Sequence, residues 1–414
     1  MDWKISLRIL MLFTGMLCIA GCSSPATDLP TTIPTNIPSP TLALTSTPMP
    51  TPAQAPTLTV EQRFNETVSH WRVAYYDRSL DQLCAMNADG SSRVCLDFDQ
   101  YPDAYLYGAP AASPDGTYGA YFGGASWSPD GSRLAFDMDL YGLYIWDPGV
   151  GVTTFRDGRD GGLYRSPQWS PDGRHISYLS TELGRSEHGI FLFDIFIDSL
   201  DRAFHRQLPL DTSGMHWAPD GQRIALARSG EIYVESPAGS NPRNLTQSPA
   251  NDMLPVWSPD GHSIAFLTDR EAVTALHVMN ADGTGIYQLT DLPVHAPSGL
   301  KWSPDAHSIS FISDADGSFD LYIANVDGSG TRQVADLNLI FEHLVDAENL
   351  LSYDHYWSAD SRSILSFKTT YRILTLGREY TYDERWIDLT TGETRVLDFP
   401  FDAASAEWFI PVSK

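Results

Sequence analysis

The sequence predicts an all-β chain that closes into a β-propeller of seven four-stranded antiparallel blades. Three features carry this prediction: a Trp that returns in a similar setting, a Ser-Pro-Asp turn that follows it in most copies, and a short apolar strand after the turn. Spacings of 42, 48, 40, 45 and 55 residues separate Trp127, Trp169, Trp217, Trp257, Trp302 and Trp357. A repeat of this length is typical of propeller blades.

Residues 1–21 have the features of a targeting segment. Lys4 and Arg8 precede an apolar run that is too short to span a bilayer comfortably, and the run ends in Ile-Ala-Gly-Cys. This ending resembles the lipobox of bacterial lipoproteins. The resemblance implies a signal peptide over residues 1–21, a lipid on Cys22, and a place in the cell envelope at the outer membrane or the outer leaflet of the cell membrane. An ordinary secretory signal with an incidental Cys is the alternative.

Residues 22–58 are expected to combine the lipidated Cys with a tether. Positions 23–58 contain nine Pro and nine Thr and a single charged residue, Asp28. Such a composition cannot bury a core and favours extended polyproline geometry. The propeller is therefore expected over residues 59–414, held away from the lipid by the tether.

Each repeat reads as two hairpins. Pro suits the second position of a type I turn and Gly the fourth, so Ser-Pro-Asp-Gly joins a first strand to a second. The second strand alternates an aliphatic, a small and a large residue, as in Ile264, Ala265 and Phe266, and this pattern predicts a strand buried between layers. A further hairpin follows, seen in LHVMNADGTGIYQLT at 276–290. Four strands make one blade.

These motifs resemble the TolB-type, WD40-like (PD40) β-propeller repeats, through WSPDGSRLAF, WSPDGRHISY, WAPDGQRIAL and WSPDGHSIAF. Six copies are present, and the seventh blade is expected to be composite. RVAYYD at 72–77 and LCAMNADGSSRVCLDF at 83–98 supply three strands, and residues 406–410 supply the missing first strand. Pairing of the two chain ends would close the ring and remove its edges. Six blades, as in TolB itself, are the alternative if 338–402 pairs irregularly.

Two Cys remain after the targeting segment and the lipidation site. Counting outward from the turn at Asp89 and Gly90 places Cys84 opposite Cys95, so a cross-strand disulfide is expected and two free thiols are the alternative. The disulfide would suit an oxidising, extracytoplasmic compartment.

The charge of the chain excludes one class of partner. Asp and Glu number 52 against 27 Lys and Arg, a net charge of −25. Such a surface repels phosphate backbones, so nucleic acid is not an expected partner.

Binding is expected on the face opposite the turns, where the connections vary most in length. The segment 99–126 is rich in aromatic residues, and 336–356 carries an acidic cluster that contains His. Tyr offers rigid, amphipathic contact area, although these rings could instead cap the core. The binding candidates are Tyr101, Tyr105, Tyr107, Tyr118, Tyr121, Arg270, His343, Asp354 and His355.

No cofactor is expected. Asp314, Asp316 and Asp320 have a spacing that resembles a calcium loop, but the remainder of an EF-hand is missing and the same positions belong to an ordinary turn. Calcium stays open as a weak alternative.

Two classes of function fit the sequence. The favoured one is a non-catalytic protein-recognition or scaffolding platform, monomeric, attached to the membrane through its lipid only, with envelope or cell-surface proteins as partners. The other is a glycan-binding protein, or a propeller hydrolase or lyase, that acts at the mouth of the central channel. The chain contains no G-x-S-x-G motif, so the sequence gives no catalytic residue to an enzyme.

Overall fold

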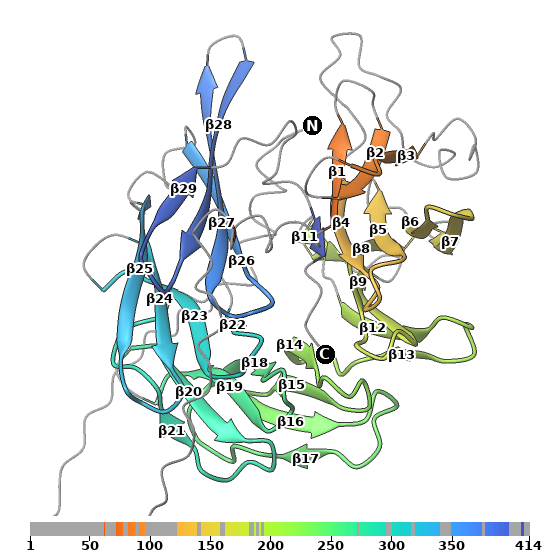
Figure 1. Ribbon diagram of the computed structural model, residues 1–414. Coiled ribbons are helices and arrows are strands. Elements are labelled where there is room, and N and C mark those ends of the chain that lie inside the picture. Colours follow the sequence, from red (N-terminus) through yellow and green to blue (C-terminus); the bar gives the residue numbers. More distant parts are fainter. Residues whose placement is uncertain are drawn as a thin grey trace, which may run out of the picture.

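Seven four-stranded antiparallel sheets surround a common centre in the computed structural model, and they are called blades 1 to 7 below (Figure 1). The structure describes residues 62, 72–77, 82–87, 91–96, 122–138, 142–157, 162–181, 186–187, 190–191, 194–270, 273–294, 300–315, 319–339, 349–374, 377–396 and 407–409. In these ranges, no helix has the length and the apolar character that crossing a membrane requires.

The first three blades in chain order contain the following strands. Blade 1 consists of β30 (Glu407–Phe409), β1 (Arg72–Asp77), β2 (Gln82–Asn87) and β3 (Val94–Leu96). Blade 2 consists of β4 (Phe122–Trp127), β5 (Leu134–Met138), β6 (Gly142–Asp147) and β7 (Gly151–Asp157). Blade 3 consists of β8 (Leu163–Trp169), β9 (His175–Thr181), β12 (Asp194–Ser199) and β13 (His205–Gln207), and β10 (Ser186–Glu187) pairs with β11 (Ile190–Phe191) in the connection between β9 and β12.

The other four blades follow without interruption. Blade 4 consists of β14 (Thr212–Trp217), β15 (Ile224–Arg228), β16 (Glu231–Glu235) and β17 (Arg243–Asn244). Blade 5 consists of β18 (Asp252–Trp257), β19 (Ser263–Thr268), β20 (Ala275–Asn280) and β21 (Tyr287–Gln288). Blade 6 consists of β22 (Lys301–Trp302), β23 (Ser308–Ser313), β24 (Phe319–Asn325) and β25 (Thr331–Leu339), and blade 7 of β26 (Asn349–Trp357), β27 (Ser363–Leu374), β28 (Gly377–Asp388) and β29 (Thr394–Val396).

The two ends of the propeller meet in blade 1, which confirms the predicted composite blade and the count of seven. β30 pairs antiparallel with β1, with Trp408 opposite Val73. β2 and β3 pair in the register counted from the sequence, with Cys84 opposite Cys95. The predicted disulfide joins these two residues. Blade 1 is therefore fixed both by a strand from the far end of the chain and by a covalent cross-link.

The Ser-Pro-Asp turns show why the repeat needs its residues. In blade 5 the amide of Gly261 donates to the carbonyl of Ser258 at 2.9 Å, and the Ser258 hydroxyl donates to Asp260 and accepts from the Ser263 amide. Gly261 has a φ of +72°, a conformation that costs other residues about 1–2 kcal/mol. Ala306 adopts a φ of +60° at the equivalent position in blade 6, so the turn keeps its shape without Gly.

Both kinds of turn lie on one face of the ring, which is called the turn face. In blade 5 the amide of Ala281, in the turn after the third strand, donates to the carbonyl of His262, in the turn after the first strand. The amide of Val326 makes the same bond to His307 in blade 6. The links between second and third strands, and between blades, consequently lie on the opposite face, which is called the loop face.

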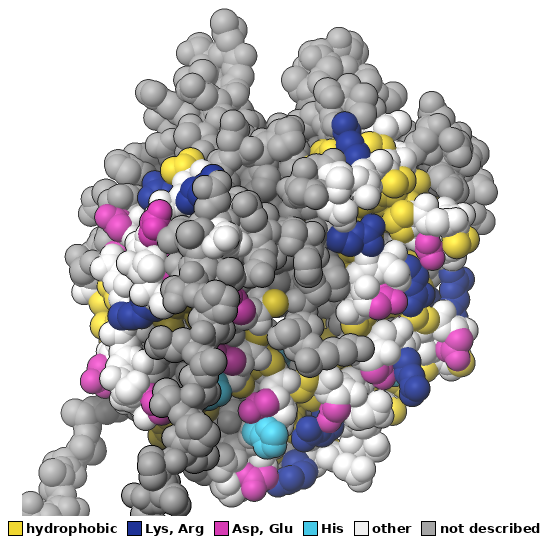
Figure 2. Space-filling view, viewed as in Figure 1, with side chains coloured by type: hydrophobic (Ala, Val, Ile, Leu, Met, Phe, Trp, Pro, Cys, Tyr) yellow, Lys and Arg dark blue, Asp and Glu magenta, His cyan; other side chains and the backbone are white. Residues whose placement is uncertain are grey.

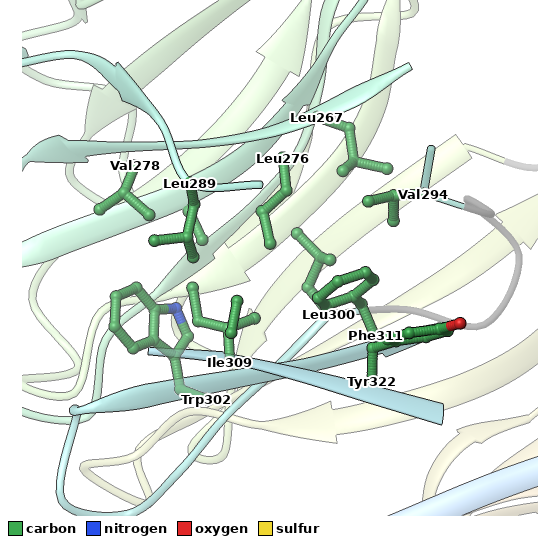
Figure 3. Close-up of a cluster of buried hydrophobic side chains, with 12 residues drawn as sticks. Leu267, Leu276, Val278, Leu289, Val294, Leu300, Trp302, Ile309, Phe311 and Tyr322 are labelled. Carbon is green, nitrogen blue, oxygen red and sulfur yellow. The ribbon is translucent and has the colours of Figure 1, made fainter. Parts of the chain in front are cut away.

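The core lies between adjacent blades. In Figure 3, Leu276 and Val278 of blade 5 point toward Ile309 and Phe311 of blade 6, and Trp302 covers one end of the layer. All five are buried. The aliphatic, small and large residues expected on each second strand are buried as well, since Ile264, Ala265 and Phe266 have no exposed surface and their counterparts in other blades are similar. Each blade thus presents an apolar face to the next one, as the alternation predicted.

Candidate functional site

First strands of neighbouring blades contact one another, as β4 does with β8 and β14 with β18, so their side chains decide the chemistry of the inner wall. Between blades 6 and 7, the ammonium of Lys301 lies 2.5 Å from a carboxylate oxygen of Asp354 and 2.6 Å from the carbonyl of His355. The same ammonium lies 4.4 Å from the ring centre of Tyr356, within cation–π range. The side chains of Lys301 and Asp354 are 32% and 46% exposed, so this charge pair is accessible to solvent. We call Lys301 and Asp354 the wall pair.

The surroundings of Asp354 change its ionisation. Burial favours its neutral form, but the charges of Lys301 and His355 and the hydrogen bonds from these two residues together outweigh burial and lower the pKa of this carboxyl below its usual value. Asp354 is therefore ionised at neutral pH and lies beside the ammonium of Lys301.

His355 lies behind the wall pair and is fully buried. Its Nε2 atom is 2.7 Å from the Ser310 hydroxyl, which also accepts the indole N–H of Trp357 at 2.9 Å. The single hydroxyl proton points to the Lys301 carbonyl, which can only accept, so the His355 contact requires a proton on Nε2. Burial, followed by the charge of Lys301, lowers the pKa of His355 to about 3. This His is neutral at physiological pH and ties blade 7 to blade 6.

His216 holds a similar place between blades 4 and 5. Its Nδ1 atom accepts the backbone N–H of Trp257 at 3.2 Å, so its proton lies on Nε2. Burial lowers the pKa of His216 to about 4. The Ser126 hydroxyl accepts from the Trp169 amide in the same way between blades 2 and 3. Ser126, His216 and Lys301, each directly before a repeat Trp, therefore reach the next blade along the inner wall.

Arg270 lies on the loop face of blade 5, where β19 ends. Its guanidinium donates to Asp252 at 2.8 and 3.3 Å, and the side chain of Asp252 is fully buried. Because Asp252 begins the first strand of this blade, the pair fixes the loop-face end of β18 to the end of β19. Arg270 is separated from Asp354 by blade 6.

The other predicted binding residues lie outside the described ranges. These are Tyr101, Tyr105, Tyr107, Tyr118, Tyr121 and His343, and the lipidation candidate Cys22 joins them. Among the calcium candidates, Asp314 is exposed on the loop face, Asp320 is buried and accepts from Gln333 at 2.7 Å, and Asp316 lies outside the described ranges. Within the part of the chain that the structure describes, no group of three or more His, Cys, Asp or Glu side chains could hold a metal ion.

Several Arg side chains on the outer strands bind the next blade, and these contacts were not predicted from the sequence. Arg206 of blade 3 donates to the buried carboxylate of Glu235 at 2.5 Å and to the carbonyl of Pro237 at 2.7 Å, both in blade 4. Arg243 donates to the carbonyl of Asp282 in blade 5, and Arg332 to that of Leu389 in blade 7. A signal for these contacts is present in the sequence, because Arg206, Arg243 and Arg332 occupy the same register on the fourth strands of their blades.

A related cluster joins blades 2 and 3. The carboxylate of Asp198, only 1% exposed, accepts from Arg156 of blade 2 and from the Tyr178 hydroxyl at 2.9 Å. His205 lies 2.6 Å from its other oxygen. Burial and the charge of Asp198 raise the pKa of Tyr178, which keeps its proton and acts as a donor. The cluster neutralises a buried carboxylate and holds two blades together.

Comparison with known proteins agrees with this geometry. Residues 140–336 match the family described as the TolB beta propeller domain, PD40. Residues 140–336 therefore consist of TolB-type propeller repeats. The resemblance stated from the repeat motifs is confirmed there, and the blades outside the matched region complete the seven-bladed ring.

Several solved structures are similar to this chain. TolB from Acinetobacter baumannii is 16% identical, with a TM-score of 0.40, over 63% of this chain and 62% of that protein. An oligogalacturonate lyase in complex with manganese is 14% identical, with a TM-score of 0.51, over 69% of this chain and 79% of that protein. Puromycin hydrolase is 16% identical, with a TM-score of 0.51, over 80% of this chain and 53% of that protein. The matched region spans less than two thirds of the TolB and puromycin hydrolase chains, and identities this low show the fold alone.

Proposed function

We propose that this protein is a lipid-anchored, extracytoplasmic lipoprotein whose propeller is a non-catalytic platform for recognising a partner protein. The observation that carries the proposal is the separation of the two faces. Short turns occupy the turn face, whereas the described strand ends that bound the longest connections, those of β3 and β4, β9 and β12, and β25 and β26, lie on the loop face. Variable segments on a rigid scaffold are where binding usually resides.

The anchor is proposed from the sequence. Residues 1–21 would be removed as a signal peptide, Cys22 would carry the lipid, and the tether to residue 58 would hold the propeller, residues 59–414, above the membrane. The Cys84–Cys95 disulfide supports an oxidising compartment outside the cytoplasm. Replacing Cys22 with Ser should move the protein from the membrane fraction to the soluble fraction, and unchanged fractionation would count against the anchor.

The proposed contacts are the Tyr residues of the connection between blades 1 and 2, with Arg270, His343, Asp354 and His355 as polar neighbours. Arg270 and the wall pair support this choice, since they place charged groups on the loop face and on the inner wall. His355 would act indirectly, because it is buried and positions the strand that carries Asp354. Asp314, Asp316 and Asp320 stay a weak calcium proposal.

The partner is proposed to be an envelope or cell-surface protein, bound by a monomer. On the face in Figure 2, Lys and Arg side chains of the described residues lie interspersed with Asp and Glu instead of forming one basic patch, which does not favour nucleic acid. Lys301 and Asp354 are paired with each other and His355 is neutral at physiological pH, so these groups give no specific support to glycan binding or to hydrolase or lyase activity.

The test replaces Tyr105, Tyr107 and Tyr118 together by Ala. Thermal unfolding reports folding, and pull-down from envelope extract reports partner capture. We expect capture to fall while the unfolding temperature is retained. Loss of folding alone would favour a core role for the rings, and a variant that folds and captures normally would refute the site.

A further inference from the structure

Two large apolar side chains on the loop face are exposed. Leu210 is 65% exposed in the link from blade 3 to blade 4, and Val273 is 48% exposed in the link between β19 and β20. The other exposed large apolar side chains of the described ranges lie on fourth strands or on the turn face. Leu210 lies in a tight turn, in which the amide of Thr212 donates to the carbonyl of Pro209 at 2.9 Å. The central positions of such turns favour Gly, Asn, Asp, Ser and Pro, so the turn itself does not require a Leu.

A series of contacts connects the two links across the loop-face ends of blades 4 and 5, which are neighbours in the ring (Figure 1). The hydroxyl of Ser229, between β15 and β16, donates to Asp211. The next residue, Gly230, packs against Asn251, because a Cβ added to this Gly would lie 3.2 Å from the side-chain oxygen of Asn251. The amide of Asn251 donates to Asp269 at 2.7 Å.

We call Leu210, Asp211, Ser229, Asn251, Asp269 and Val273 the blade 4–5 surface. Its parts are held together by these contacts before any partner arrives, and such preorganisation lowers the entropy cost of binding.

The accessible charge of the blade 4–5 surface is negative. Asp211 and Asp269 are exposed, and each uses one carboxylate oxygen in the bonds given above. Neither carboxylate forms an ion pair with a residue that the structure describes. The two Arg side chains beside them are engaged elsewhere, since Arg270 donates to a buried carboxylate and Arg228 lies 4.2 Å from the ring centre of Tyr233. The surface therefore offers two carboxylates together with two apolar side chains.

These features select the occupant. A protein segment with Lys or Arg beside large apolar side chains would complement the carboxylates and cover Leu210 and Val273. The chain's own tether is a poor occupant, because positions 23–58 contain no Lys or Arg. A second copy is disfavoured by the net charge of −25 on each chain, and anionic lipids or polysaccharides are disfavoured by the same charge.

We infer that the blade 4–5 surface binds a segment of the partner protein that carries Lys or Arg beside large apolar side chains. This inference rests on the proposed recognition function and names the place and the chemistry of the contact.

The probe is a library of short random peptides displayed on phage and selected against the full protein. We expect enrichment of sequences in which Lys or Arg flank Leu, Ile, Val or Phe. An enriched peptide, synthesised with a fluorophore, should bind in fluorescence anisotropy. The double variant Leu210→Gln with Val273→Gln should weaken this binding by about tenfold or more. The matched control Val150→Gln changes a Val that is 85% exposed on the turn face, and should leave binding within about twofold of the natural protein.

The charges are tested by a second double variant. Asp211→Asn with Asp269→Asn keeps an acceptor for the Ser229 hydroxyl and for the Asn251 amide but removes both charges. Binding should weaken about threefold at low ionic strength and less at high ionic strength. The control Asp282→Asn, at an exposed turn-face Asp that also accepts a backbone amide, should bind as the natural protein does. Thermal unfolding of each variant verifies that it is folded.

Enriched peptides that bind the Leu210 and Val273 variant as they bind the natural protein would overturn the inference. Enrichment of acidic peptides, or no enrichment at all, would also overturn it. So would a dimer in light scattering that this variant dissociates, because the occupant would then be a second copy. If binding does not depend on the blade 4–5 surface while the Tyr105, Tyr107 and Tyr118 variant still loses its partner, the location is wrong and the recognition function stands.

Discussion

The turn after each first strand allows a quantitative test, because the same left-handed position is occupied by Gly in four blades and by Ala306 in blade 6. Gly173 has a φ of +68°, and a Cβ added there would lie 3.8 Å from its nearest neighbour, Pro129. Gly173→Ala should therefore cost only the net backbone term, about 0.5 kcal/mol, because the stiffer unfolded chain offsets part of the left-handed strain. Gly221 has a φ of +67°, and its added Cβ would lie 2.6 Å from Asp172 Cγ and 3.0 Å from the Asp172 backbone nitrogen. Gly221→Ala should cost about 2–4 kcal/mol, because overpacking adds to the backbone term.

Ala306→Gly should act in the opposite direction. The substitution removes the strain of a left-handed Ala from the folded state. This gain in stability exceeds the free-energy cost of a more flexible unfolded chain by about 0.5 kcal/mol. The matched control is Ala203→Gly, at an exposed turn residue without a positive φ, which should lose about 0.5 kcal/mol.

Urea unfolding of the four variants, followed by circular dichroism, gives the differences in free energy, and thermal unfolding gives a second measure. For a cooperative unit of about 350 residues, 1 kcal/mol shifts the unfolding temperature by only about 1.4 °C, so the free-energy differences are taken from the urea midpoints and slopes. Equal losses for Gly173→Ala and Gly221→Ala would refute the contact with Asp172. A loss for Ala306→Gly as large as that for Ala203→Gly would refute the backbone argument.

Three further experiments test the contacts that hold the blades. Replacing both Cys84 and Cys95 by Ala should lower the free energy of unfolding by about 2–3 kcal/mol. It should also speed hydrogen exchange in β1 and β30 more than in blade 5. An equal increase in all blades would show that the disulfide does not support ring closure. Ser310→Ala removes a hydrogen-bond partner of both His355 and Trp357, whereas Ser177→Ala removes only the acceptor of Trp217. Both variants should lower the free energy of unfolding by about 1–3 kcal/mol, and Ser310→Ala should lower it more. Equal losses in urea unfolding would contradict the His355 contact. The pKa of His355 falls from 6.5 to about 3 on folding, so the unfolded chain binds this proton at a higher pH than the folded chain, and stability should decrease as the pH falls from about 6.5 toward 3. His355→Gln should flatten this dependence of the free energy of unfolding on pH. An unchanged slope would show that His355 does not titrate this way.

The repeat was predictable because its residues act locally. A Trp, a turn and an alternating strand specify each blade wherever they occur, and Trp408 at one end matches RVAYYD at the other as two parts of one blade. The disulfide was predictable for the same reason, since counting from Asp89 and Gly90 sets the hairpin register without further information.

Contacts between blades were not predictable from such local signals. Arg206 and Glu235 are 29 positions apart and lie on strands of different blades, so nothing in either segment reveals the pairing. His355, expected among the binding residues, is buried against Ser310 of the preceding blade, which its own acidic surroundings in the sequence do not indicate. The length of the β27–β28 hairpin was not predicted either, because its turn contains neither Gly-Asn nor Asp-Gly, the pairs that mark a tight hairpin in a sequence. Without such a mark, irregular pairing over 338–402 remained an alternative.

Photo-crosslinking from two positions of blade 6 tests most directly whether the loop face binds the partner. Asp314 follows β23 on the loop face and Asp327 follows β24 on the turn face, and both are exposed. A benzophenone amino acid would replace each residue in turn in the anchored protein, and light-dependent adducts with envelope proteins would be resolved by gel electrophoresis and mass spectrometry. Recognition through the loop face predicts a defined adduct from position 314 and none from 327. A defined adduct from 327 alone, or the same adducts from both positions, would contradict recognition through the loop face.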